Sequence, residues 1–142
     1  MKYILLVSHG TMAQGVHSVL DMLVGEGRED ILSTSLKNGM GADELAENVR
    51  ECVSVVKGDD ELIVFADLIG GSPLTTTANV LAEEGLLNRT TMIGGMNLPL
   101  VVSAIVSKDG METGKLVDML IPEAREALRT FTVEVSEAED DI

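Results

Sequence analysis

Short apolar runs alternate with helix-like patterns along the chain, and this alternation constrains the fold more than any other feature. Apolar runs of strand length occupy residues 2–7, 31–35, 61–67 and 89–93. Each is followed by apolar residues at helical spacing, in the ranges 13–24, 42–57, 73–85 and 98–107. Strands separated by helices are typical of a parallel sheet that carries helices on both faces. The pattern predicts a three-layer α/β sandwich of flavodoxin-like character.

The C-terminal part of the chain departs from this alternation. A second consecutive helical pattern covers residues 112–129, and Pro122 is expected to kink or split that helix. Residues 131–135 alternate between apolar and polar, which indicates a last strand at a sheet edge or against a partner. We therefore expect a mostly parallel sheet with one antiparallel edge strand, in a single domain spanning residues 1–142. Five acidic residues among the last nine suggest a solvated, frayed tail.

Charge and composition exclude several functions. The net charge of −14 argues against binding to nucleic acid or to an anionic membrane through a basic surface. No apolar run approaches the length of a membrane span and no signal-type segment opens the chain, so a cytoplasmic protein is expected. Cys52 is the single cysteine, which leaves no disulfide or cysteine-rich metal site, and its helical pattern suggests a buried thiol.

Three unusual segments follow predicted strands. They are Ser8–Thr11, Asp67–Pro73 and Gly94–Pro99. The carboxyl ends of parallel strands share one edge of the sheet, where ligands bind in open α/β folds. The sequence thus predicts a site built from these three segments.

His9 is the strongest candidate for chemistry, because a histidine at a strand end can carry a proton, a metal or a phosphoryl group. A histidine alone at such a position is more often a hydrogen-bonded structural residue than a catalytic one. Asp67, after another strand, could fix the tautomer of its ring and leave the second nitrogen free to attack. His17 lies within a helical pattern and is interpreted as structural or exposed.

The segment from Gly70 to Pro73 is suited to an anion. Ser72 is a good N-cap and Pro73 fits a first helical position, so free N–H groups at this helix start could hold an anion, aided by Gly70 and Gly71. The segment could also be simply a well-formed turn.

Three further candidates lie in the other two segments. Gly10 and Thr11, beside His9, could add donors for phosphoryl oxygens. Asn97 could cap a helix or form a wall of the crevice.

The segments resemble the enzyme IIA component of the mannose-type (mannose/fructose/sorbose) sugar phosphotransferase system. The matching stretches are Ile4–Gly10, Phe65–Pro73 with its D-x-x-G-G-S-P pattern, and Gly95–Pro99 with G-x-N-x-P. Length and element order agree over essentially the whole chain.

The resemblance implies that His9 accepts a phosphoryl group on Nε2 from the phosphohistidine of HPr. It implies that His9 passes the group to a histidine of enzyme IIB during sugar uptake, so that the protein meets the membrane indirectly, through the IIC and IID components. Asp67 would hold Nδ1 and Ser72 would lie in the phosphoryl pocket, with no cofactor or metal. The family fold is a homodimer whose C-terminal strand crosses to the partner sheet, a role that would fall to residues 131–135.

The chain departs from the family pattern at Leu68 and Ile69, where some relatives carry a threonine and a tryptophan. A hydroxyl and an aromatic pocket wall are therefore expected to be missing. The chain ends without an Ala/Pro-rich linker, so enzyme IIB is expected to be a separate polypeptide. The acidic surface would steer a basic HPr face.

Other classes fit less well. Small tetrapyrrole metal chelatases and histidine phosphatases need a second histidine at the site, and a flavin or nucleotide module needs stacking aromatics or a phosphate loop. The phosphotransfer subunit of dihydroxyacetone kinase would keep the fold and change the partner. The residues do not identify a sugar or reveal a sensory role.

Overall fold

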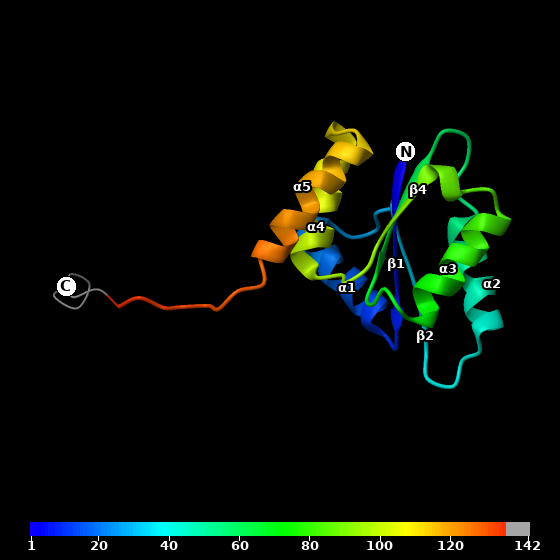
Figure 1. The fold of residues 1–142 in the computed structure, drawn as a ribbon, viewed down its shortest axis with the longest axis horizontal. Helices are drawn as coiled ribbons and strands as arrows, with labels where there is room; N and C mark the ends of the chain where they lie inside the picture. Colours follow the sequence, from blue (N-terminus) through cyan, green and yellow to red (C-terminus); the bar gives the residue numbers. More distant parts are fainter. Residues whose placement is uncertain (136–142) are drawn as a thin grey trace.

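Four strands form one parallel sheet in the order β2-β1-β3-β4. The structure is a computed structural model that describes residues 1–135 (Figure 1). β1 pairs with β2 and with β3, and β3 pairs with β4, so that β4 is an edge strand. The strands are β1 (Lys2–His9), β2 (Ile31–Leu36), β3 (Glu61–Ala66) and β4 (Thr90–Ile93).

Helices cover both faces of the sheet (Figure 1). One layer holds α1 (Met12–Val24), α4 (Leu98–Ser107) and α5 (Thr113–Glu126), and the other holds α2 (Ala42–Val53) and α3 (Ser72–Glu83). Two short 3-10 turns, Leu87–Arg89 and Lys108–Gly110, lie between elements. The predicted flavodoxin-like three-layer α/β architecture is confirmed.

The apolar run of β1 explains why it lies in the centre. Residues 4–7 are all fully buried, and they alternate between two cores. Ile4 and Leu6 pack with the α1/α4/α5 layer, whereas Leu5 and Val7 pack with the α2/α3 layer. A strand with helices on both sides needs apolar side chains at every position, which is what this sequence provides.

Two helix predictions need correction. The helix predicted for residues 42–57 ends at Val53, and a turn leads from there to β3. The helix predicted for 112–129 is not split, because α5 continues through Pro122. Pro122 and Asp118 are both exposed, so the Asp118 carbonyl that loses its helical partner can bond to water instead.

The C-terminal segment has no strand partner within residues 1–135, and its pairing with a partner chain stays a prediction. Residues 131–135 form no strand within the single chain, and the sheet of residues 1–135 contains no antiparallel strand. Instead the segment extends away from the domain after α5 (Figure 1), with Phe131 88% exposed. The acidic residues from position 136 onward lie outside the described residues.

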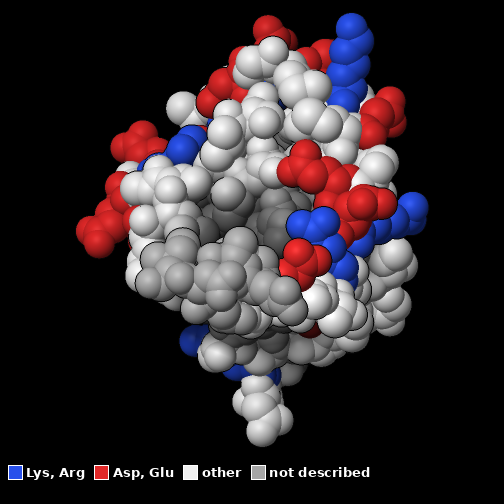
Figure 2. All heavy atoms as spheres, turned by 90° about the vertical axis from the view of Figure 1, so that its left-hand side faces the viewer, with Lys and Arg blue, Asp and Glu red and all other residues white. Residues whose placement is uncertain are grey.

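Charge is dispersed on the face that carries α4 and α5. Figure 2 shows acidic side chains spread over this face with basic ones among them.

Within residues 1–135, no helix is long and apolar enough to cross a membrane.

Candidate functional site

His9 and Asp67 meet at the point where the strand order reverses. β1 ends at His9, and Asp67 follows the neighbouring β3 directly. The connections after these two strands lead to opposite faces of the sheet, which opens a crevice at their carboxyl ends. The structure therefore brings the two predicted residues together at the position where α/β folds bind ligands.

One carboxylate oxygen of Asp67 fixes His9 twice. Oδ2 accepts the His9 main-chain N–H at 2.9 Å and lies 2.8 Å from ring Nδ1. Oδ1 accepts the N–H of Leu68 at 2.8 Å. A carboxylate beside Nδ1 favours the proton on that nitrogen, so Nε2 is left as the nucleophilic atom. His9 remains 45% exposed while Asp67 is only 12% exposed, so the orienting group is shielded and the ring is accessible.

These hydrogen bonds keep Asp67 ionised. Partial burial alone would raise the pKa of Asp67, but the bonds from the His9 N–H, the His9 ring and the Leu68 N–H outweigh burial and lower it. A fixed negative charge beside Nδ1 stabilises positive charge on the imidazole. Such a charge would develop if Nε2 attacked an electrophile.

Gly71 determines where the ring of His9 can lie. A Cβ at Gly71 would fall 2.5 Å from His9 Cε1 and 3.1 Å from Nε2. The ring therefore packs directly on the glycine, with its reactive edge against the start of α3. The backbone of Gly71 is in an ordinary extended conformation, so the absence of a side chain is required for space.

The start of α3 presents free donors, although its cap differs from the prediction. Gly71 is the N-cap and Ser72 is the first helical residue, with no capping bond from the Ser72 hydroxyl. Within residues 1–135, the N–H groups of Ser72 and Leu74 donate to no protein acceptor, and Pro73 has none to donate. Free N–H groups at a helix N-terminus bind anions, and the helix dipole adds to the attraction.

The loop after His9 uses its polar groups differently from our expectation. The Gly10 N–H donates to the Leu36 carbonyl at 2.9 Å, so it is engaged with β2. The Ser8 hydroxyl accepts the Ala13 N–H at 2.7 Å and thus takes the capping role at α1, a role the sequence analysis missed. Thr11 occupies the N-cap position of α1 without a side-chain capping bond, and it is exposed.

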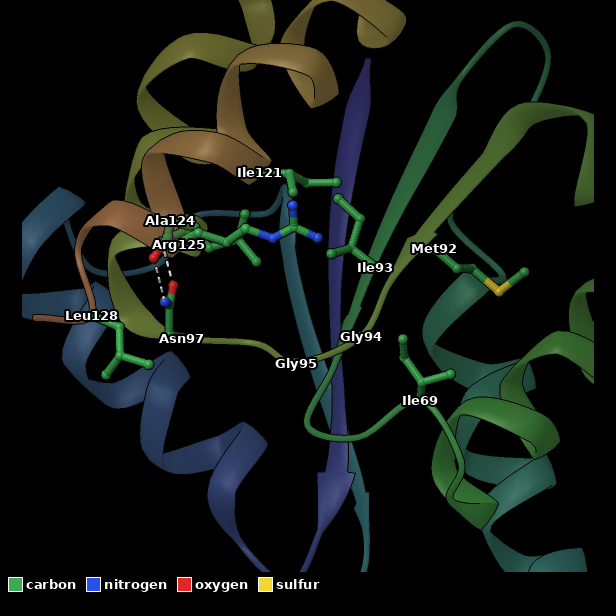
Figure 3. A pocket seen from close by; sticks show the side chains of 11 residues that line it. Ile69, Met92, Ile93, Gly94, Gly95, Asn97, Ile121, Ala124, Arg125 and Leu128 are labelled. Carbon is green, nitrogen blue, oxygen red and sulfur yellow. Dashed lines mark hydrogen bonds between the residues drawn. The ribbon is translucent and has the colours of Figure 1, made fainter.

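Asn97 caps α4 and lines a separate groove. Its Oδ1 accepts the Leu100 N–H at 3.0 Å, and its Nδ2 donates to the Ala124 carbonyl at 3.0 Å. The groove, of about 460 Å³, lies between β4, α5 and the loop that carries Ile69 (Figure 3). His9 is not among its lining residues. Leu68 is 58% exposed next to Asp67, on the rim of the crevice.

The remaining candidates are structural. His17 Nδ1 lies 2.7 Å from the Ser33 hydroxyl, in agreement with the structural interpretation, so it supplies no second histidine beside His9. Cys52 is partly buried, and burial raises the pKa of its thiol. Chelatase and phosphatase chemistry, which need two histidines at the site, are not supported.

The fold and the site define an α/β protein with an accessible histidine, oriented by a buried aspartate, at the switch point of a β2-β1-β3-β4 sheet. The family model for the PTS system fructose IIA component matches residues 3–121. The chain therefore belongs to this family, the mannose-type enzyme IIA components of the sugar phosphotransferase system.

Individual relatives agree with this assignment. The chain is 22% identical over 120 residues to the PTS system fructose-specific EIIA component of Bacillus subtilis, covering 84% of this chain and 80% of that protein. The structure of phosphotransferase system component EIIA from Streptococcus agalactiae matches with a TM-score of 0.79 at 25% identity, over 92% of this chain and 97% of that one. The mannose/sorbose-specific IIA subunit from Enterococcus faecalis matches with a TM-score of 0.76 at 26% identity, over 96% and 99%.

Proposed function

We propose that His9 is a phosphoryl carrier, which accepts the group from the phosphohistidine of HPr and passes it to a histidine of enzyme IIB. The observation that carries this proposal is the pairing of His9 Nδ1 with Asp67 Oδ2 at 2.8 Å, with the ring still accessible. The family match and the relatives support the general assignment, that the chain is a component of a sugar phosphotransferase system. One relative is fructose-specific and another is mannose/sorbose-specific, so membership of the family does not identify a sugar for this chain.

The transfer needs a nucleophile, an orienting group and donors for the moving group. The Nε2 lone pair attacks phosphorus, the new N–P bond forms, and the N–P bond of the donor breaks with its electron pair returning to the donor ring. The proton stays on Nδ1, where the Asp67 carboxylate stabilises the phosphorylated imidazolium. The N–H groups of Ser72 and Leu74, with the hydroxyls of Thr11 and Ser72, bind the phosphoryl oxygens. Transfer to enzyme IIB is the reverse of these steps toward a new acceptor.

Docking would use the exposed rim around His9. Leu68 and Ile69 are 58% and 75% exposed next to Asp67 and provide an apolar contact for a partner protein. The net charge of −14 would accelerate encounter with a basic partner face. A transfer rate from HPr that does not change with salt would contradict this steering.

The proposed functional unit is a homodimer in which residues 131–135 of one chain pair with the sheet of the other. β4 has an unpaired edge, and the groove beside it is lined by apolar residues such as Met92, Ile93 and Leu128 (Figure 3). Phe131, Val133 and Val135 are 88%, 70% and 70% exposed in the single chain. Exchange would bury these three side chains and would pair the free edge of β4 in each of the two chains.

The test is incubation with phosphoenolpyruvate, enzyme I and HPr, followed by intact-mass measurement. We expect wild-type protein and His17→Ala to gain one acid-labile phosphoryl group and His9→Ala to gain none. Adding enzyme IIB should then discharge the phosphorylated protein. A wild-type chain that is folded but never phosphorylated, or His9→Ala that is phosphorylated like wild type, would contradict the proposal.

A further inference from the structure

The four connections that follow the strands carry very little charge. They comprise Gly10–Thr11, residues 37–41, residues 67–71 and residues 94–97. Within them Lys37 is the one basic residue and Asp67 the one acidic residue. In a chain with 24 acidic and 10 basic residues, these four connections are unusual in carrying a single cation and a single anion. The two flank His9, because Lys37 follows β2, Asp67 follows β3, and β1 runs between those strands.

Lys37 is held close to His9 by the backbone. Leu36 pairs with His9 in the β1–β2 ladder, and the Leu36 carbonyl accepts the Gly10 N–H at 2.9 Å. The turn that follows is closed by the Met40 N–H, which donates to the Lys37 carbonyl at 2.9 Å, with Gly39 at a φ of 85°. The base of the lysine side chain is therefore fixed one residue beyond the partner of His9.

Lys37 and His9 also line one groove, of about 340 Å³, together with Asn38. Lys37 is exposed and forms no ion pair with any carboxylate of residues 1–135. Lys2, Arg28, Arg50 and Lys108 are each engaged with a carboxylate, whereas Lys37 is one of the six basic residues that have no such partner within residues 1–135. The ammonium group of Lys37 is thus available to a ligand of His9.

A phosphoryl group on His9 needs such a cation. The phosphoryl group carries nearly two negative charges. The neighbouring carboxylate of Asp67 stabilises the ring but repels the phosphoryl oxygens. The start of α3 offers N–H donors on one side of His9, and these carry only partial charge. We propose that the Lys37 ammonium group binds the phosphoryl oxygens from the β2 side and stabilises the phosphorylated state. The inference rests on the proposed phosphoryl-carrier function.

The lysine takes no part in the exchange of bonds. The N–P bond to Nε2 forms as the donor's N–P bond breaks, while Lys37 keeps its proton and pairs with the transferred oxygens. Its contribution therefore appears in the equilibrium between phosphorylated donor and phosphorylated His9. A contact made with the partner protein alone would change the rate of docking and leave this equilibrium unaltered.

The experiment measures that equilibrium. Phosphorylated HPr, freed of enzyme I and phosphoenolpyruvate, is mixed with each variant, and both phosphorylated proteins are quantified by intact mass. For Lys37→Gln we expect the transfer equilibrium constant to fall about fivefold, the size expected for one solvent-exposed ion pair. Lys37→Arg should keep most of the wild-type value. Lys57→Gln, the same charge change before β3 at the opposite end of the sheet, should leave it unchanged.

A second measurement follows hydrolysis of the isolated phosphorylated protein, with no partner present. The rate constant for loss of the phosphoryl group should differ from wild type in Lys37→Gln and match wild type in Lys57→Gln. An equilibrium constant for Lys37→Gln equal to that of wild type or of Lys57→Gln would overturn the inference while the carrier function stands. A wild-type protein that accepts no phosphoryl group would overturn both.

Discussion

Asp67 Oδ2 accepts two hydrogen bonds from a single residue, the main-chain N–H of His9 at 2.9 Å and its ring Nδ1 at 2.8 Å. The position of the strand end and the orientation of the ring are therefore fixed by one atom. Because β1 and β3 are paired up to Val7 and Ala66, this atom lies at the end of a continuous ladder. His9 is thus held at the end of the two most buried strands of the sheet.

The first prediction follows from this bond. Asp67→Asn keeps the size of the side chain but removes the charge that holds Nδ1–H and stabilises the phosphorylated ring. We expect phosphorylation of His9 to slow about 10- to 100-fold, the loss of one charge-assisted hydrogen bond. Single-turnover mixing with phosphorylated HPr measures the rate of this phosphorylation. Nitrogen NMR of the His9 ring should show an altered tautomer ratio, and an unchanged rate and tautomer ratio would contradict the orienting role.

The second prediction separates the two adjacent glycines. A Cβ at Gly71 would collide with the His9 ring, whereas one at Gly70 would meet nothing within 4 Å. Neither residue has a positive φ, so alanine suits both backbones. Gly71→Ala should reduce the rate of phosphorylation at least about tenfold by displacing Nε2 from its donors. Gly70→Ala is the matched control and should behave as wild type. Equal rates in the two variants would show that the ring tolerates displacement.

The pairing of His9 with Asp67 could be predicted because both follow strongly apolar runs. Parallel strands place their carboxyl ends at one edge of the sheet, which predicted that both residues share that edge. The structure makes them neighbours because β1 pairs with β3. The start of α3 was predicted within one residue, although the cap fell on Gly71 instead of Ser72. A difference of one residue at a helix end is decided by local backbone angles that composition does not reveal.

Other features depend on distances that no sequence pattern encodes. The packing of His9 on Gly71 is a contact between residues far apart in the chain. Lys108 is only 1% exposed, although lysine is among the most exposed residue types, and its partner Asp30 lies in a loop that gives no signal of the pairing. Residues 131–135 alternate in a strand-like pattern but form no strand in the described chain, because a pattern cannot supply the neighbouring strand. Their pairing with a partner chain stays a prediction.

The third prediction concerns the ion cluster at the end of the sheet opposite His9. Asp30 Oδ2 lies 2.8 Å from Lys108 Nζ and 2.7 Å from Arg28 Nη2. Removing the carboxylate in Asp30→Ala leaves the Lys108 ammonium buried, with Asp109 as its remaining partner. The free energy of unfolding should fall by about 2–4 kcal/mol. Lys108→Met replaces the charge by an apolar side chain and should lower the free energy of unfolding by less than Asp30→Ala does. Urea unfolding at pH 7 measures both, and a larger loss in Lys108→Met would contradict this account.

The same cluster predicts a pH dependence. The hydrogen bond from Arg28 lowers the pKa of Asp30, against the opposing effect of burial and with further help from Lys108. A carboxylate with a lowered pKa in the folded state contributes stability above its unfolded pKa of about 3.9 and loses it as pH falls below that value. Wild-type protein should therefore lose more stability than Asp30→Ala between pH 5 and pH 3. If the free energy of unfolding fell equally in the two proteins between pH 5 and pH 3, Asp30 would be excluded as a source of that pH dependence.

The fourth prediction concerns the contact that ties the Asp67 loop to β4. A Cβ at Gly94 would fall 2.2 Å from Ile69 Cγ1 and 3.2 Å from Ile69 Cα. Gly94→Ala should therefore displace the loop and destabilise the protein by about 1–3 kcal/mol. Adding Ile69→Ala removes the closer of the two clashes, so the double variant should recover part of the loss. Chemical denaturation of the four proteins of this cycle gives the coupling energy, and strict additivity would show that the two residues do not meet.

The fifth prediction tests the exchanged dimer. Truncation after Thr130 removes Phe131, Val133 and Val135, the apolar side chains that are exposed in the single chain. Truncation after Val135 keeps them and removes only the acidic tail. Sedimentation velocity at micromolar concentration should give a dimer for the full chain and for the longer truncation, and a monomer for the shorter one. The loss follows because β4 then has no strand to pair with its free edge. A full chain that sediments as a monomer, or a dimer that survives the shorter truncation, would show that residues 131–135 do not form the interface.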